Sequence, residues 1–139
     1  MKSDAPNIIN VTKKAIQQFQ NLKKEKDSLL FNRSAKEVFI MSMTMGFYND
    51  NKIALESKKE FVRIEYLNDK EKSLIKAIAV CDEENIDVLL DKKKVYSIAE
   101  EYAAGGIQHL VDDMLKEQEG SATKKLETQL VEEFTKLKK

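Results

Sequence analysis

Residues 34–46 decide the fold, and they read SAKEVFIMSMTMG. Ser34 and Glu37 have the spacing of a capping box, in which each side chain accepts a hydrogen bond from the other residue's backbone amide. The residues that follow, 38–45, are apolar almost all round, which is typical of a helix in the middle of a core. Gly46 is expected to end this helix in a left-handed conformation. The stretch therefore predicts a central helix around which the rest of the chain packs.

Four further segments repeat apolar residues at the three- and four-residue spacing of helices. They are residues 10–27, a segment that starts at Asn68 or Asp69 with Glu71 completing its cap, residues 92–117, and the tail after Gly120. Residues 52–56 and 61–66 instead alternate apolar and polar positions, so they predict a hairpin or separate extended edges. The sequence thus predicts an all-α fold, a compact bundle of about five helices with a short extended or hairpin segment near residues 52–66.

The domain is expected to span residues 1–118, because Gly120-Ser121 is the one convincing boundary, and residues 119–139 to form a separate amphipathic helix. Cys81 lies among apolar positions of the third helix and is expected to be a buried structural cysteine. The predicted core consists of Val38, Phe39, Ile40, Met43, Leu74, Ile78, Ile98, Tyr102 and Leu110.

Two glycines, Gly105 and Gly106, lie inside the segment 92–117, where each costs a helix about 1 kcal/mol relative to alanine. We expect the helix to continue through them, which puts Gly106 at the centre of its apolar stripe. A glycine there allows another backbone to come close, so both are predicted to be close-packing residues. A large side chain at Gly106 should cost at least about 1–3 kcal/mol through overpacking.

The residues that usually carry catalysis or bind metals do not cluster in this sequence. Its only cysteine and only histidine, Cys81 and His109, are 28 positions apart, so a zinc site is not expected. The pairs at 100–101 and 112–113 are adjacent acidic residues, which diverge on a helix and indicate surface charge. We therefore expect no enzyme, no cofactor and no bound metal.

Net charge is zero, but lysines concentrate toward both ends of the chain. Residues 1–30 carry six Lys or Arg against three Asp or Glu, whereas residues 61–120 carry eight against fourteen. The ordinary explanation is a set of solvated helix faces. The alternative is contact with a DNA backbone through five lysines near the N-terminus. They are Lys13, Lys14, Lys23, Lys24 and Lys26.

The tail after Gly120 has a regular apolar stripe that a free helix could not leave in water. An isolated helix of about 17 residues is marginal, so this tail should dock on its own domain, on a second copy or on another protein. The stripe is the predicted partner surface, and it consists of Leu126, Leu130, Phe134 and Leu137.

A cytoplasmic location is expected from two features. The N-terminal residues lead into no apolar segment of a signal peptide, and a lone cysteine suits a reducing compartment.

Several motifs follow one another in the order seen in a known family. KEVFI at 36–40 leads to Gly46-Phe47, then to the region of Leu55 and Arg63-Ile64, the helix LIKAIA at 74–79, and IAEEYAAGGI at 98–107. This order, over roughly residues 30–116, resembles the DNA phosphorothioation-associated protein 4 family. Those are small accessory proteins of loci that replace a phosphate oxygen of DNA with sulfur and often restrict unmodified DNA.

The resemblance implies a role beside a DNA-modification, restriction or phage-defence complex, and it brings no catalytic residue with it. The first hypothesis is a non-catalytic accessory protein that docks on larger protein components of such a system, with no membrane contact and with self-association left open. The second is a small DNA-binding protein that contacts phosphates through lysines of its terminal helices.

Overall fold

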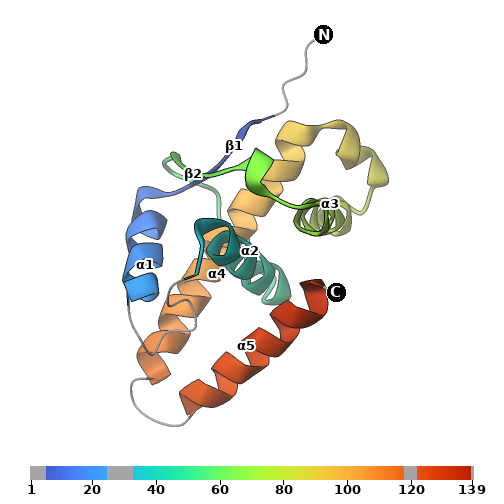
Figure 1. Ribbon diagram of the computed structural model, residues 1–139. Helices are drawn as coiled ribbons and strands as arrows, with labels where there is room; N and C mark the ends of the chain where they lie inside the picture. The colour runs from blue at the N-terminus through green and yellow to red at the C-terminus, as the bar shows by residue number, and fades with distance from the viewer. Residues whose placement is uncertain (1–5, 25–32, 118–121, 139) are drawn as a thin grey trace.

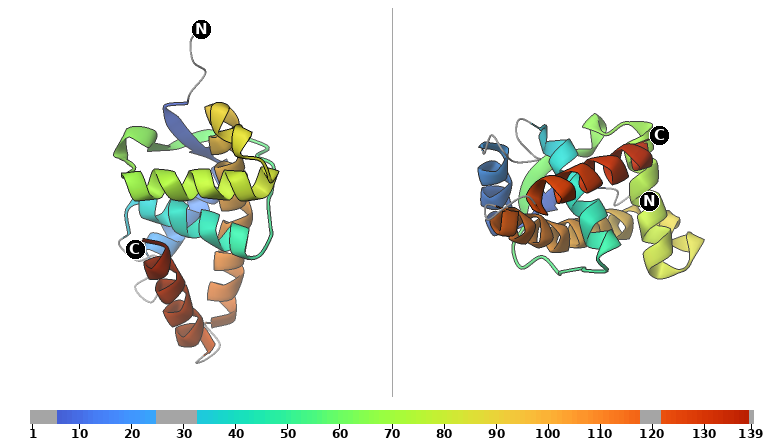
Figure 2. Two further views of the ribbon diagram at one scale, coloured as in Figure 1. Left: turned by 90° about the vertical axis from the view of Figure 1, so that its right-hand side faces the viewer. Right: turned by 90° about the horizontal axis from the view of Figure 1, so that it is seen from below.

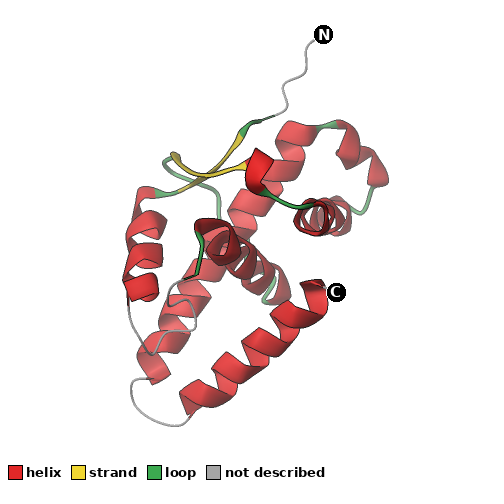
Figure 3. Cartoon of the chain, in the orientation of Figure 1, coloured by secondary structure: helices red, strands yellow, loops and turns green. Residues whose placement is uncertain are grey.

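The computed structural model of the chain describes residues 6–24, 33–117 and 122–138, with side chains described except in 113–117, 122–128 and 138. This part of the chain forms five α-helices, two short strands and two 3₁₀ helices (Figures 1 and 3). The predicted all-α bundle is therefore confirmed. In chain order the elements are β1 (Ile8–Val11), α1 (Lys13–Lys24), α2 (Ala35–Tyr48), β2 (Lys59–Arg63), η1 (Ile64–Tyr66), α3 (Asp69–Glu83), η2 (Ile86–Leu90), α4 (Lys92–Glu117) and α5 (Ala122–Lys138).

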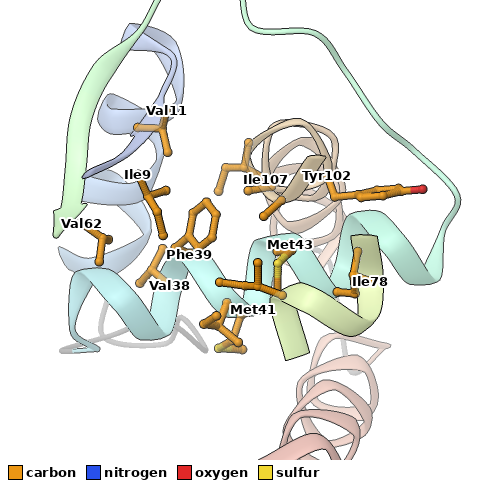
Figure 4. Close-up of a cluster of buried hydrophobic side chains, with 14 of the residues drawn as sticks. Ile9, Val11, Val38, Phe39, Met41, Met43, Val62, Ile78, Tyr102 and Ile107 are labelled. Atoms are coloured by element: carbon orange, nitrogen blue, oxygen red, sulfur yellow. The ribbon is translucent and has the colours of Figure 1, made fainter. Parts of the chain in front are cut away.

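Helix α2 is the central helix that its sequence predicts. The Ser34–Glu37 capping box is present in both directions, and the helix buries residues on every side rather than along one stripe. Its side chains point toward the two strands on one side and toward α3 and α4 on the other (Figure 4). Eight of the nine predicted core residues are buried, and the ninth, Leu74, is half-buried against the same cluster.

Helices α2 and α4 cross with their backbones in contact. A Cβ atom built on Gly106 would overlap the carbonyl oxygen of Ser42, and one built on Gly46 would overlap the carbonyl oxygen of Tyr102. The prediction that Gly46 ends α2 is wrong, because the helix continues to Tyr48 and uses this glycine to approach α4. The predicted continuous helix through Gly105 and Gly106 is confirmed, since α4 runs without a break from Lys92 to Glu117.

The first predicted helix is shorter at its N-terminus, because residues 8–11 form a strand. β1 pairs antiparallel with β2, and the register places Val11 opposite Lys59, with an irregularity between Ile9 and Asn10. Of the two arrangements predicted for residues 52–66, the structure has extended chain and not a hairpin within this range, since residues 52–56 join no ladder and β2 pairs with the N-terminal strand. Thr12 then starts α1, its hydroxyl accepting from the amide of Ala15 at 3.0 Å.

Helix α3 begins with the predicted cap, in which Asn68 and Glu71 bond reciprocally. Its buried face is narrower than expected, since Ala77 and Cys81 are exposed. The prediction of a buried Cys81 is wrong because the buried face centres on Ile75 and Ile78. At about 100° per residue, Cys81 lies roughly 120° from Ile75, on the flank that turns to solvent.

Helices α1, α3 and α5 lie around the central pair formed by α2 and α4 (Figures 1 and 2). Helices α1 and α3 lie at opposite sides of the molecule, with α2 and α4 between them (Figures 1 and 2). The C-terminal helix α5 follows the end of α4 and runs back past α2 toward α3 (Figure 1). Helices α1 and α5 therefore expose separate surfaces, and these two are called the outer helices below.

Candidate functional site

An apolar hollow lies between α2 and α5. It has a volume of about 520 Å³, and we call it the α2–α5 groove. The backbone of α5 lies close to α4 and α3, while α2 faces it across the groove. Its lining comes from α2 and the residue after it (Met41, Thr44, Met45, Phe47, Tyr48, Asn49), from α4 (Leu110) and from α5 (Gln129, Leu130, Glu133, Phe134, Leu137).

The predicted tail stripe supplies one wall of this groove. Leu130 and Phe134 are half-buried and pack against the core cluster, whereas Leu137 keeps 41% of its surface exposed. The side chain of Leu126 lies outside the described residues. The tail therefore docks on its own chain through part of its stripe, and that docking leaves the groove open.

Large apolar side chains at the groove face solvent. Phe47 is 37% exposed and Tyr48 is 73% exposed, both at the C-terminal end of α2. Asn49 ends this helix by donating its side-chain amide to the carbonyl of Met45 at 2.8 Å. The wall also contains the hydroxyl of Thr44, which is buried and has no hydrogen-bond partner among the described residues.

A second cluster, on α3 and α4, joins Asp82, Tyr102 and Lys52. The Tyr102 hydroxyl donates to Asp82 Oδ1 at 2.6 Å, and Lys52 Nζ donates to Asp82 Oδ2 at 2.9 Å. Burial raises the pKa of Asp82, but the hydrogen bonds from Tyr102 and Lys52 outweigh it and leave that pKa lowered. Burial and the Asp82 carboxylate both raise the pKa of Tyr102. The phenol thus stays protonated as a donor, and the cluster fastens the segment after α2 to α3 and α4.

A buried carboxylate connects β1 to α4. Glu100 accepts a hydrogen bond from the backbone amide of Asn10 at 2.7 Å, at the point where the β1–β2 register is irregular. The irregularity frees this amide from the ladder, and Glu100 satisfies it. Burial raises the pKa of Glu100, although the Asn10 amide and nearby Lys58 act in the opposite direction. The arrangement fixes the N-terminal strand on the long helix.

The remaining chemistry-bearing residues of the described chain form no assembled site. His109 is half-buried, with Nε2 3.1 Å from Asn51 Nδ2. Among the side chains that the structure describes, no group of three or more His, Cys, Asp or Glu has the arrangement to hold a metal ion.

The predicted DNA-contact lysines lie along α1. Lys13, Lys14 and Lys24 are exposed, Lys23 is half-buried, and Lys26 lies outside the described residues. The structure adds Lys58 and Lys59, which the pairing of β2 with β1 places beside the start of α1. Sequence reasoning missed this neighbourhood, because the two segments are more than forty residues apart and each strand is only four or five residues long.

Comparison with known protein families shows which family the chain belongs to. A family described as DNA sulphur modification system-associated protein 4 matches the chain over residues 9–139. The chain belongs to this family. The family match includes β1, α1 and α5, which lie outside the range of about 30–116 over which the motifs resemble it. No curated protein and no solved structure matches this family member. None of its described helices is long and apolar enough to cross a membrane.

Proposed function

We propose that this protein is a non-catalytic docking subunit of a DNA sulphur modification system. Its α2–α5 groove would receive an apolar helix from a larger protein component of that system. The observation that carries the proposal is the groove itself, about 520 Å³ in volume and rimmed by exposed Phe47, Tyr48 and Leu137. Exposed apolar surface that is hollowed and contiguous is typical of protein-binding sites.

The spacing of the two walls favours a helix as the occupant. On α2 the wall is formed by Met41, Met45 and Tyr48, and on α5 by Leu130, Phe134 and Leu137. Both sets have the i, i+4, i+7 spacing of one helix face. A third helix that inserts its own apolar ridge between these two ridges would match both walls.

The chemistry of the lining fits an apolar ridge with a polar edge. Met41 and Met45 are unbranched and adaptable, so they can fill the irregular space between two helices. Thr44 offers a buried hydroxyl that no described residue bonds, and Gln129 and Glu133 line the groove on the α5 side. A partner helix with one polar residue in its apolar stripe would satisfy that hydroxyl.

The proposal includes no catalytic role because the titratable side chains described above are hydrogen-bonded to one another or to the backbone. Asp82, Tyr102 and Lys52 satisfy one another, and Glu100 is bonded to the Asn10 amide. These four side chains stabilise the bundle, and none of them lines the groove. Among the residues that line the groove, Glu133 alone has a carboxylate and none is a His, Cys or Lys, so the groove offers mainly apolar binding surface.

The test uses charge placed on the exposed rim. Tyr48→Asp and Leu137→Asp should each weaken binding to co-expressed components of the modification system at least tenfold, since a carboxylate would have to be desolvated at the contact. Affinity would be measured by calorimetry or interferometry with purified components, after co-purification has identified which component binds.

The matched control is Tyr66→Asp, which introduces the same charge at a tyrosine that is 63% exposed and does not line the groove. It should bind as the parent protein does. Equal binding by the parent, the two rim variants and the control would overturn the proposal, provided that all four proteins melt at similar temperatures.

A further inference from the structure

Helix α1 presents a solvent face without a carboxylate. Its sequence, KKAIQQFQNLKK, contains four lysines and no acidic residue, whereas each of the other four α-helices contains at least one Asp or Glu. Ala15, Phe19 and Leu22 point inward and are buried. The outward side chains are all exposed, and they are Lys13, Lys14, Gln17, Gln20, Asn21 and Lys24.

Two more lysines extend this face past the start of the helix. The β1–β2 register places Lys59 opposite Val11, and the backbone amide of Lys13 donates to Ser57 Oγ at 3.2 Å. These contacts place Lys58 and Lys59 beside Lys13, and both lysines are exposed. Glu56 and Glu60 flank these two lysines in the sequence. The charges of the two lysines and the two glutamates cancel, so the net positive charge of this surface comes from the lysines of α1.

Among the described residues, the lysines of this face are not neutralised by ion pairs. The ion pairs of that part of the chain involve other basic residues, namely Arg33, Lys36, Lys52, Arg63, Lys94 and Lys136. Lys58 additionally acts on the buried Glu100 carboxylate. Lys13, Lys14, Lys24 and Lys59 remain available to an external anion.

Contacts with β2 and α4 on the inner side of α1 fix the position of its outer face. The ring of Phe19 stacks on Phe61 of β2 with centroids 4.9 Å apart, and the side chain of Gln18 accepts from Gln108 of α4 at 3.3 Å. A helix fixed on its inner side presents its outer side chains without a further ordering cost at the backbone.

We propose that the outer face of α1, together with Lys58 and Lys59, binds the phosphate backbone of duplex DNA. Lys13 and Lys24 are eleven residues apart, so they span about 17 Å along the helix. That is enough to reach phosphates on both sides of a major groove roughly 12 Å wide. The Gln and Asn amides between the lysines suit further bonds to phosphate oxygens, which hold a protein on DNA without reading its sequence.

The distribution of charge explains how a protein of zero net charge can do this. Helix α3, on the opposite side of the molecule from α1 (Figure 2), has four acidic residues and three lysines. Helix α1 has four lysines and no acidic residue, so uncompensated positive charge is concentrated on the α1 side. Approach to a polyanion would therefore favour α1 facing it.

The experiment measures binding of a fluorescent duplex of about 25 base pairs by anisotropy as salt is raised. The triple variant Lys13→Gln, Lys14→Gln, Lys24→Gln should bind at least tenfold more weakly at about 100 mM salt. Its plot of log affinity against log salt should be shallower by roughly 2–3, because each lost phosphate contact removes about 0.9 from the slope.

The matched control removes the same charge elsewhere, with Lys70→Gln, Lys76→Gln and Lys93→Gln, all exposed and away from α1. It should keep the parent slope and bind within about twofold of the parent. Equal losses in the two triples, or no binding by the parent at about 50 mM salt, would overturn the proposal. Displacement of the duplex by polyglutamate at equal charge would overturn it in favour of an acidic protein, and preference for single-stranded RNA would do so in favour of RNA.

Discussion

The two outer helices, α1 and α5, are both amphipathic, but the bundle seats them differently. Helix α1 buries its whole apolar stripe, with Phe19 only 1% exposed. Helix α5 leaves Leu130 and Phe134 half-buried and Leu137 exposed, with the α2–α5 groove behind them. This difference determines which surface of each helix is free to bind a partner. The fold has used the inner face of α1, so only its basic outer face is free, whereas α5 still has apolar inner surface to share.

The largest expected effect comes from removing the central aromatic side chain of each helix. Phe19→Ala should lower the free energy of unfolding by about 3–5 kcal/mol, because it empties a fully buried site stacked on Phe61. Phe134→Ala should cost only about 1–2 kcal/mol, because that side chain is already partly in water. Chemical denaturation of both variants gives the two values. Equal losses would show that α5 is seated as firmly as α1.

A smaller effect concerns the contact that fixes β1, and with it α1, on α4. Burial raises the pKa of Glu100 above its ordinary value of 4.5, so the folded protein takes up this proton at a higher pH than the unfolded chain does. The contribution of Glu100 to stability therefore rises as the pH falls through the folded pKa toward the ordinary value, and it is lowest above the folded pKa.

Glu100→Gln should remove this pH dependence while keeping an oxygen that accepts from the Asn10 amide. At pH 8 the variant should be at least as stable as the parent, and its melting temperature should change less between pH 8 and about pH 5. Parallel pH profiles for the two proteins would show that Glu100 is not the group responsible. No comparable buried carboxylate is found on the described part of α5, so the effect is specific to the seat of β1 and α1.

The smallest expected effect is in the groove wall. Thr44→Val replaces a buried hydroxyl, which has no partner in the described part of the chain, by a methyl group of similar size. The free energy of unfolding should stay the same or rise by up to about 1 kcal/mol, because no hydrogen bond is lost and a desolvated polar group is removed. A clear loss of stability in denaturation would mean that the hydroxyl has a partner in solution, and the groove would then be less apolar than its lining indicates.

Local signals in the sequence predicted most of the fold. The two capping boxes, Ser34 with Glu37 and Asn68 with Glu71, bond across three residues, so the sequence contains both partners and the helix starts are correct. The continuous α4 follows from its regular stripe. The match between pattern and structure is closest where one segment contains all the interacting groups.

Features that depend on distant segments were predicted wrongly or missed. Gly46 has the local character of a helix end, but its role is set by the backbone of α4 at Tyr102 and Gly106, more than fifty residues later. The four residues of β1 are too few to show alternation clearly, and their partner strand starts at Lys59. The α2–α5 groove and the position of Lys58 beside Lys13 depend on how whole elements pack, which periodicity does not specify. The tail stripe was visible in the sequence, but its incomplete burial was not.

The contacts that seat α1 also set the order of events during synthesis. Its partners are β2, which ends at Arg63, and α4, which bonds to it through Gln108 and to β1 through Glu100. The ribosome must therefore add about 40 residues after Lys24 before the strand pair can close, and more than 75 before the α4 contacts can form. Pairings this distant form late, because their loops must close first. Helix α1 is thus made before the other four described α-helices but packs only after much of α4 has been made, so a fixed row of lysines is displayed only after these contacts have formed.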